Sequence, residues 1–152
     1  MIKSVHLENF EGHKKSKLDL HEGLNVIIGK TDKGKSSIRR ALRWVKDNRP
    51  GGDEFRSHGG GDTSGIVKTT EGTQVKRTKT NKLNTYELNK GEPFKAFGLG
   101  VPEEIQKALN FDEINIQNQF GNVFLLQDTP GNVAKHFNKV ANLDKIDRAT
   151  KN

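Results

Sequence analysis

The residues best suited to chemistry form one glycine-rich run, Gly29-Lys-Thr-Asp-Lys-Gly-Lys-Ser-Ser37. It fits the pattern G-x-x-x-x-G-K-[ST] of a phosphate-binding loop. Backbone N–H groups of such a loop, and of the helix that follows it, point at phosphate oxygens. Lys35 would contact the outer phosphates, and the Ser36 hydroxyl would ligate Mg²⁺. A glycine-lysine surface turn could also match this pattern by chance.

The sequence on either side of this run has the order strand, loop, helix, which a phosphate-binding loop requires. The apolar residues 24–28 predict a strand, and residues 36–46 predict a helix. One stripe of this helix is apolar and would pack on a sheet: Ile38, Ala41, Leu42 and Val45. Gly29 and Gly34 permit backbone angles and a close approach to phosphate that a Cβ would prevent. This context favours nucleotide binding over a chance match.

The composition excludes several classes of protein. With 152 residues, 31% of them hydrophobic and 30% charged, the chain is long enough for one polar-coated α/β domain, or is a fragment of a larger protein. It has no apolar run long enough to span a membrane and no signal-peptide pattern at its N-terminus. The absence of cysteine excludes disulfides and zinc-thiolate sites, and it suits a reducing cytoplasm.

The net charge of +7 is concentrated in two segments. Residues 33–49 hold seven basic side chains against one acidic side chain, and residues 68–90 hold six against two. Such basic segments indicate a polyanionic partner, most plausibly nucleic acid, and they equally fit a solvated face that keeps the protein soluble.

The remaining N-terminal sequence reads as short strands. Residues 2–10 alternate apolar and polar side chains, and residues 16–20 follow a turn. Three further strands, at 65–70, 73–78 and 82–88, predict an antiparallel meander. The intervening loop, residues 48–65, contains many glycines and is expected to be mobile.

The C-terminal third predicts helices and lacks an expected acidic residue. Residues 102–109 predict a short helix, Thr129 is a candidate N-cap for another, and residues 143–151 are helical again. A complete nucleoside triphosphatase also places an acidic residue directly after an apolar strand, where it holds Mg²⁺. Residues 123–126 are apolar, but Asp128 follows one residue too late. The chain therefore holds half of an active site.

Four segments together resemble one family: residues 2–10, 23–29, 34–37 and 41–44. They are similar to the N-terminal segment of SMC/SbcC-type ATPases, the ABC-class enzymes of DNA double-strand-break repair and chromosome organisation. Residues 115–119 and 124–126 resemble the Q-loop of that family. Residues 137–143 resemble the helix that leads toward its coiled coil. The likeness spans nearly the whole chain, although only the phosphate loop is highly specific by itself.

The resemblance implies an α/β fold of the P-loop NTPase class, in which residues 1–152 form the N-terminal lobe of an ABC/SMC-type head. The expected architecture is a mixed central sheet, an antiparallel β-meander beside it, and C-terminal helices leading to a coiled coil. The C-terminal lobe would carry the missing acidic residue. The expected cofactors are ATP and Mg²⁺, and this lobe alone would be inactive as an ATPase.

The family also implies partners. Two heads form a homodimer around ATP, each completed by the C-terminal lobe of the same protein. An SbcD-type nuclease binds the heads, and double-stranded DNA makes backbone contacts with them. No membrane is involved, and the compact form of the chain suggests the cytoplasm of a bacterial or phage-infected cell.

The resemblance assigns roles to individual residues. The loop residues Gly29, Lys30, Thr31, Asp32, Lys33, Gly34, Lys35, Ser36 and Ser37 would bind the nucleotide. Gln119, or alternatively Gln117, matches the glutamine that reaches Mg²⁺ and the attacking water, so the expected catalytic residues are Lys35 and Gln119 and the metal ligands Ser36 and Gln119. His13 is a candidate for a position near the base or ribose.

Two departures from the family pattern stand out. Thr31-Asp32 replaces the usual Asn-Gly, which brings a negative charge near the phosphates. Glu11 stands where the family often has a basic residue.

Two other functions remain open from the sequence. One is a self-contained small P-loop kinase, in which residues 49–56 would form an arginine-bearing lid. The other is a non-enzymatic domain whose loop grips nucleic-acid phosphates.

Overall fold

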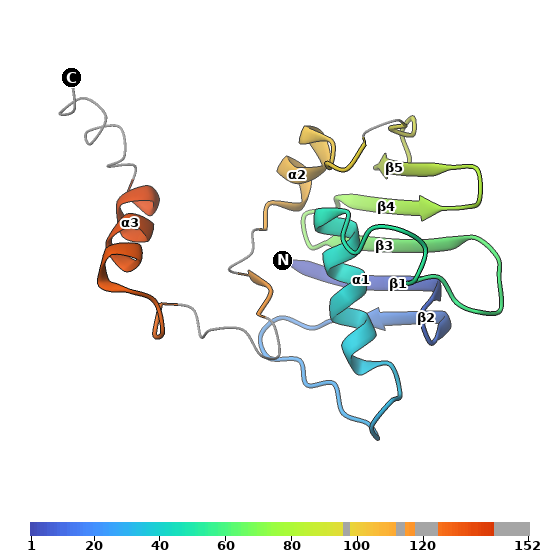
Figure 1. Ribbon diagram of the computed structural model, residues 1–152, viewed down its shortest axis with the longest axis horizontal. Helices are drawn as coiled ribbons and strands as arrows, with labels where there is room; N and C mark the ends of the chain where they lie inside the picture. The colour runs from blue at the N-terminus through green and yellow to red at the C-terminus, as the bar shows by residue number, and fades with distance from the viewer. Residues whose placement is uncertain (96–97, 112–114, 118–124, 142–152) are drawn as a thin grey trace. The chain divides into compact units, whose positions relative to one another are not determined.

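A computed structural model of the chain describes residues 1–95, 98–111, 115–117 and 125–141. The chain divides into two units, Met1–Phe111 and Asp112–Asn152. The first unit contains five strands and two helices: β1 (Ile2–Phe10), β2 (His13–Asp19), α1 (Lys35–Asp47), β3 (Thr63–Thr69), β4 (Gln74–Lys79), β5 (Asn84–Leu88) and α2 (Glu103–Leu109). The second unit contains α3 (Pro130–Val140) (Figure 1).

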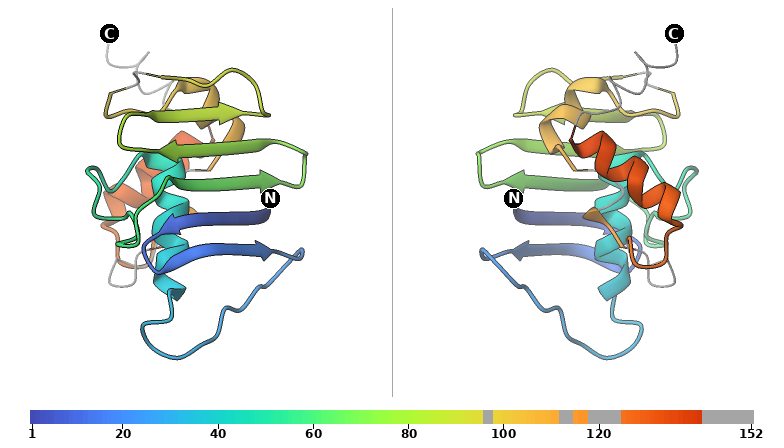
Figure 2. Two further views of the ribbon diagram at one scale, coloured as in Figure 1. Left: turned by 90° about the vertical axis from the view of Figure 1, so that its right-hand side faces the viewer. Right: turned by 90° about the vertical axis from the view of Figure 1, so that its left-hand side faces the viewer.

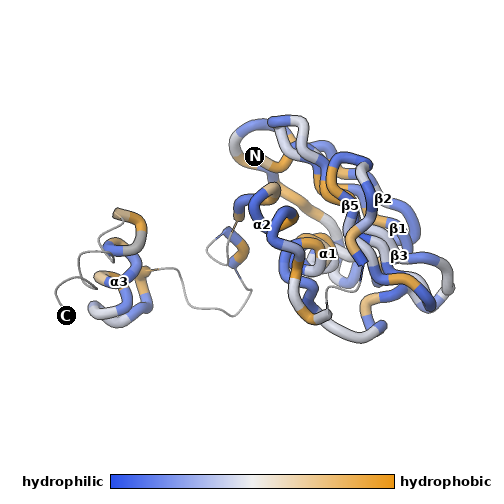
Figure 3. The backbone as a smooth tube through the Cα atoms, turned by 90° about the horizontal axis from the view of Figure 1, so that it is seen from above, coloured by the Kyte–Doolittle hydropathy of each residue, from blue (hydrophilic) through white to orange (hydrophobic). Residues whose placement is uncertain are grey.

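The five strands form one sheet in the order β2-β1-β3-β4-β5, and every neighbouring pair is antiparallel. Val5 pairs with Leu18 on one side and with Val67 on the other, and Val67 pairs in turn with Val75. Three of these four residues are almost completely buried. Both α1 and α2 pack on the same face of the sheet (Figures 2 and 3).

This arrangement corrects the predicted architecture in two respects. The predicted meander is confirmed as β3–β5, but its strands extend the sheet of β1 and β2 instead of forming a second one. Residues 24–28 form no strand in the described chain, so the predicted strand there is wrong and the described sheet is antiparallel throughout. The side chains of Leu24 and Ile28 are 91% and 86% exposed. An apolar segment becomes a strand only where another strand pairs with it, and no strand of the described sheet pairs with residues 24–28.

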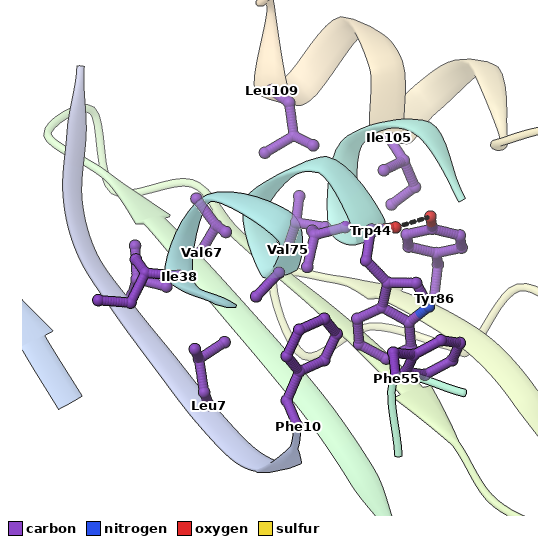
Figure 4. Close-up of a cluster of buried hydrophobic side chains, with 13 residues drawn as sticks. Leu7, Phe10, Ile38, Trp44, Phe55, Val67, Val75, Tyr86, Ile105 and Leu109 are labelled. Carbon is purple, nitrogen blue, oxygen red and sulfur yellow. Dashed lines mark hydrogen bonds between the residues drawn. The ribbon is translucent and has the colours of Figure 1, made fainter. Parts of the chain in front are cut away.

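The core lies between α1 and the sheet (Figure 4). The Trp44 ring lies 5.5 Å from the Phe10 ring and 4.8 Å from the Phe55 ring, measured between centroids. On another side, the Arg77 guanidinium lies 4.6 Å from the Trp44 ring and 4.7 Å from the Tyr86 ring. These contacts combine burial of large aromatic surfaces with cation–π attraction, so they fix α1 firmly to the sheet.

Gly65 allows the close approach of β3 to α1. A Cβ at this position would lie 2.9 Å from Cγ2 of Val45 and 3.4 Å from Cζ3 of Trp44. The glycine in this strand therefore serves helix packing, since any side chain would push α1 away from the sheet.

The glycine-rich loop between α1 and β3 is anchored, which differs from the expected mobile loop. Phe55 is 2% exposed because it packs against the core aromatic rings. The Glu11 N–H donates to the Phe55 carbonyl at 2.7 Å, and the Ser57 N–H donates to the Asn9 carbonyl at 2.9 Å. One apolar residue among many glycines thus ties the middle of the loop to the turn after β1.

The predicted helices 36–46 and 102–109 are confirmed as α1 and α2, within one residue at each end. Thr129 caps α3 as predicted, since its hydroxyl oxygen accepts the Asn132 N–H at 3.4 Å. The predicted helix 143–151 lies outside the described residues. Among the described residues, no helix has the length and apolar character needed to cross a membrane.

Candidate phosphate-binding site

The first turn of α1 presents the features of an anion site. Gly34 is the N-cap residue with φ 83°, a left-handed conformation that favours glycine, and it has no side chain with which to cap the helix. The first turn of the helix contains no acidic residue. The Ser37 N–H donates to the Gly34 carbonyl at 3.0 Å. The N–H groups that precede it, together with the positive end of the helix dipole, can stabilise a phosphate.

Lys35 bends back over the loop that precedes it. Its ammonium group donates hydrogen bonds to the carbonyl oxygens of Gly29 and Lys30, each at 2.7 Å. These bonds hold the loop in a curve around the charged group. The lysine of the motif is thus placed within the loop, at the end of α1 where the helix dipole also favours negative charge.

The two serines of the motif face different surroundings. Ser36 is exposed, so its hydroxyl is accessible to a metal ion. Ser37 is 4% exposed, and its hydroxyl donates to the Glu11 carboxylate. Ser36 is therefore the serine that fits Mg²⁺, whereas Ser37 joins the loop to the turn after β1.

His13 lies against the loop. Its Nε2 is 3.0 Å from the Gly34 carbonyl oxygen, and its Nδ1 is 2.8 Å from the Ser16 hydroxyl. Because a carbonyl oxygen only accepts, Nε2 carries the proton and donates to it. A Cβ on Gly34 would lie 2.7 Å from this nitrogen, so the glycine is required for the contact as well as for its backbone angle. The structure thus brings His13, predicted near a base or ribose, beside the phosphate loop.

Glu11 is a site residue whose role the sequence did not reveal. Its carboxylate accepts two hydrogen bonds from Arg40, at 2.6 Å from Nε and 2.5 Å from Nη2, in addition to the Ser37 hydroxyl. Burial by itself raises the pKa of Glu11, but the bonds from Arg40 and Ser37 outweigh burial and the net pKa is lowered. The hydrogen bonds that Arg40 donates to Glu11 also raise the pKa of Arg40, although burial by itself lowers that pKa. The available signal was the i, i+3 spacing of Ser37 and Arg40, which places both on one helix face.

The other loop residues are exposed. Lys30, Thr31, Asp32 and Lys33 all face solvent, and Asp32 adopts a left-handed conformation with φ 58°. Asp32 therefore shapes the turn, a role that suits aspartate because its short side chain tolerates this conformation.

The predicted catalytic glutamine cannot be compared with this site. Gln119 lies outside the described residues, as do residues 123 and 124 of the apolar run that precedes Asp128. Gln117 is exposed and belongs to the second unit of the chain. In the described ranges, no three histidine, aspartate or glutamate side chains cluster as a metal site would.

A comparison with known protein families identifies the family to which the chain belongs. The AAA ATPase domain family matches residues 1–148, nearly the whole chain. The chain is a member of this ATPase family. The match runs through the phosphate loop, α1 and the sheet, and it confirms the predicted likeness to the N-terminal lobe of SMC/SbcC-type ATPases.

Two curated relatives match the chain over short segments. The DNA double-strand break repair Rad50 ATPase of Methanococcus maripaludis is 36% identical over 56 residues, which is 37% of this chain and 6% of the relative. The DNA replication and repair protein RecF of Lactococcus lactis is 34% identical over 44 residues, 29% of this chain and 12% of the relative. The matched segments thus span a small part of either protein.

Solved structures share the fold. A structure from work on ATP-driven dimerization and DNA-stimulated activation of SMC ATPases aligns over 91% of this chain and 98% of its own, with a TM-score of 0.64 and 14% identity. The RecF–ATP structure aligns over 62% of this chain and 28% of its own, with a TM-score of 0.53 and 24% identity. The fold is therefore that of the SMC and RecF ATPases.

Proposed function

We propose that this chain binds ATP and Mg²⁺ at the loop of residues 29–37, as the N-terminal lobe of a DNA-repair ATPase. The observation that supports this most strongly is the position of Lys35. Its ammonium group is held by two loop carbonyls at the start of a 13-residue helix whose N-cap has no side chain. A cation and the N–H groups of the helix start at one point suit a polyphosphate.

In this proposal, different residues bind the phosphates, bind Mg²⁺ and position the loop. Lys35 and the loop N–H groups hold the phosphates, and the exposed Ser36 hydroxyl contributes one oxygen ligand to Mg²⁺. Mg²⁺, when bound, neutralises charge on the phosphates and keeps most of its other ligands as water or phosphate oxygen. His13 and Glu11 position the loop through Gly34 and Ser37. Gln119 supplies the second metal contact and orients the attacking water.

The exposed apolar segment supports the proposal that this lobe needs another. Leu24, Val26 and Ile28 are 91%, 71% and 86% exposed, directly before the phosphate loop. Because these three residues alternate along the chain, their side chains would share one face of an extended segment, and an exposed apolar face marks a surface that another part of the protein covers. We propose that the C-terminal lobe of the same protein covers residues 24–28 and brings the acidic residue that completes the magnesium site.

The assembled protein is proposed to act on DNA. One structural neighbour comes from work on the ATP-driven dimerization and DNA-stimulated activation of SMC ATPases, and the two relatives are DNA repair proteins. We propose that two heads of this protein likewise form a homodimer on ATP, contact double-stranded DNA through its backbone, and regulate access for an SbcD-type nuclease in the cytoplasm.

The alternative of a self-contained kinase has less support. Its lid would need arginines of residues 49–56 that are free to meet a phosphate. Of the two arginines in this range, Arg56 does not suit that role, because it donates to the Asn81 side chain at 2.6 Å and to the Gly61 carbonyl at 3.1 Å. The anchoring of Phe55 further fixes this stretch to the core.

The proposal is tested by ATP affinity in the presence of Mg²⁺, measured by calorimetry on the chain, on Lys35→Ala and on Lys82→Ala. Lys82 is exposed on a distant turn, so Lys82→Ala removes the same charge away from the loop. We expect Lys35→Ala to weaken binding by about 10- to 100-fold, the usual worth of a charged hydrogen bond, with Lys82→Ala unchanged. Wild-type affinity in Lys35→Ala would show that the site is elsewhere. ATP turnover by the 152-residue chain alone would contradict the need for a second lobe.

A further inference from the structure

Two carboxylates belong to the surroundings of the phosphate loop, and they differ in their contacts. The Glu11 carboxylate is neutralised, because Arg40 donates two hydrogen bonds to it, at 2.6 and 2.5 Å, and the Ser37 hydroxyl donates a third. Asp32 lies within the loop and is exposed. Its side chain makes no hydrogen bond or ion pair with any residue that the structure describes. The loop therefore carries one negative charge that the described part of the fold leaves uncompensated.

The backbone conformation of Asp32 does not account for this charge. Its φ of 58° lies in the left-handed region, which glycine adopts freely and asparagine tolerates as well as aspartate does. Either of these uncharged residues would form the same turn. What aspartate adds to the loop, beyond the turn itself, is a negative charge.

That charge lies close to the start of α1. Asp32 is two residues before the N-cap Gly34, and two residues of chain span at most about 7 Å. With the reach of its own side chain, the carboxylate is within about 10 Å of the helix start, which is roughly one Debye length at 0.1 M salt. Water and salt therefore screen the interaction only in part, and the carboxylate repels a polyphosphate bound there.

The lysines of the loop act in the opposite direction. Lys30 and Lys33 are exposed on either side of Asp32, and the Lys35 ammonium is held by the loop carbonyls. Three cations against one carboxylate leave the loop attractive to phosphate. Asp32 therefore weakens this attraction without reversing it, and the loss grows with the negative charge of the ligand.

We propose that Asp32 makes the phosphate loop select a metal-bound polyphosphate over a metal-free one, an inference that rests on the proposed nucleotide site. A divalent cation on the phosphates cancels part of their charge, so the repulsion from the Asp32 carboxylate is smaller when the cation is present. A neutral residue at this position would accept the two forms more nearly alike. Because phosphoryl transfer depends on the cation, Asp32 thereby disfavours an unproductive complex.

The test compares two uncharged variants at this position. Asp32→Asn keeps the shape of the side chain, and Asp32→Gly keeps the freedom to adopt the left-handed conformation. The matched control is Glu71→Gln, which removes one exposed carboxylate from the turn between β3 and β4. Calorimetry measures the ATP affinity of the chain and of each variant, in excess Mg²⁺ and in EDTA, at about 0.05 M and about 0.5 M salt.

We expect both Asp32 variants to bind metal-free ATP about 3- to 10-fold more tightly than the natural chain at low salt, with a smaller gain for Mg²⁺-bound ATP. The gain should shrink at high salt, because screening is then stronger. Glu71→Gln should keep the selectivity of the natural chain. No gain for metal-free ATP, or equal gains for the two forms, would overturn the proposal. A loss confined to Mg²⁺-bound ATP in Asp32→Asn would also overturn it, because the carboxylate would then be a metal ligand.

Lys35→Ala, measured alongside, separates a failure of this inference from a failure of the proposed function. If Lys35→Ala weakens ATP binding while Asp32→Asn keeps the natural selectivity, only the role of Asp32 is wrong. If Lys35→Ala leaves ATP binding unchanged, the nucleotide site itself is wrong, and the role of Asp32 falls with it.

Discussion

The two ends of α1 differ in what surrounds them. At its C-terminal half, Trp44 is completely buried among aromatic rings and the Arg77 guanidinium. At its N-terminus, the helix begins at an uncapped glycine beside an exposed loop, and the apolar residues 24–28 before that loop face solvent. One helix thus serves packing at one end and binding at the other.

The two ends of α1 therefore contribute differently to the free energy of unfolding. A helix start normally gains about 1 kcal/mol from a serine, threonine or aspartate cap, and a glycine forgoes only a few tenths of that. With Gly34 at the N-cap the loss is small, and no capping side chain competes with a ligand for the N–H groups of the first turn. The large contributions come from the opposite end, where aromatic side chains exclude water. Substitutions at the two ends should therefore differ sharply in their effect on unfolding.

The largest expected effect is at Trp44. Trp44→Ala removes the ring that contacts Phe10, Phe55 and Arg77, and it should lower the free energy of unfolding by about 3–5 kcal/mol. Urea denaturation followed by far-UV circular dichroism measures this change, and Trp44→Phe should recover part of it. A loss below about 1 kcal/mol would mean that the C-terminal end of α1 does not hold the fold.

The next largest effect is expected at Gly65. Gly65→Ala places a Cβ 2.9 Å from Cγ2 of Val45, and such overpacking costs roughly 1–3 kcal/mol. Gly51→Ala is the matched control, because a Cβ there meets nothing within 4 Å. Thermal unfolding of both variants separates crowding from the general effect of a methyl group. If Val45→Ala relieves the crowding, the double variant will lose less than the sum of the two single losses.

A pH dependence should come from Tyr86. Burial raises the pKa of Tyr86 to about 12, although its contact with Arg77 opposes the shift. At pH 7 the hydroxyl is protonated in both folded and unfolded chains, so its ionisation contributes nothing there. Between pH 10 and 12 the unfolded chain releases the proton while the folded chain keeps it, so stability falls as pH rises, by roughly 2–3 kcal/mol in total.

The phenylalanine variant isolates this contribution. Tyr86→Phe removes the oxygen that accepts the Arg77 N–H at 2.6 Å, and it should cost about 1–2 kcal/mol at pH 7. Because the variant has no phenol to ionise, its disadvantage relative to the natural chain should shrink as pH rises above 10. Urea titrations at pH 7, 10 and 11.5 measure the difference, and a gap that stays constant across them would refute the assignment.

The smallest effect is expected at the other end. Val26 is 71% exposed, so Val26→Ser should change the free energy of unfolding by less than about 0.5 kcal/mol. The same substitution at Val45, which is 1% exposed, should cost about 2 kcal/mol or more. Equal losses at the two valines would show that residues 24–28 are already packed in the isolated chain.

Sequence patterns predicted the elements that depend on local periodicity. The alternation of β1 and the turns of the meander appear where their spacing placed them, and three of the four residues of the predicted stripe of α1 are buried. The fourth, Leu42, is only partly buried, and the prediction missed Trp44, which is completely buried. The predicted features depend on the periodicity of apolar residues and on the positions of glycine, and a single sequence shows both.

Contacts between distant residues could not be predicted in this way. Nothing local reveals that Phe55 closes the core from within a glycine-rich loop, or that Glu11 pairs with Arg40. Residues 24–28 show the reverse error, because their apolar run has the composition of a buried strand without a described neighbour to pair with. Pairing is a property of the assembled sheet, and a run of side chains does not determine it.

Hydrogen exchange of the chain, with and without a non-hydrolysable ATP analogue and Mg²⁺, tests the contrast between the two ends most directly. Amides of residues 29–37 should exchange quickly in the free chain and become protected on binding. Amides near Trp44 should already be slow and change little, because the core is formed without the ligand. Lys35→Ala should need about 10- to 100-fold more analogue to reach the same protection. Protection that appears elsewhere while residues 29–37 stay unchanged at saturating analogue would contradict the assignment of this loop as the nucleotide site.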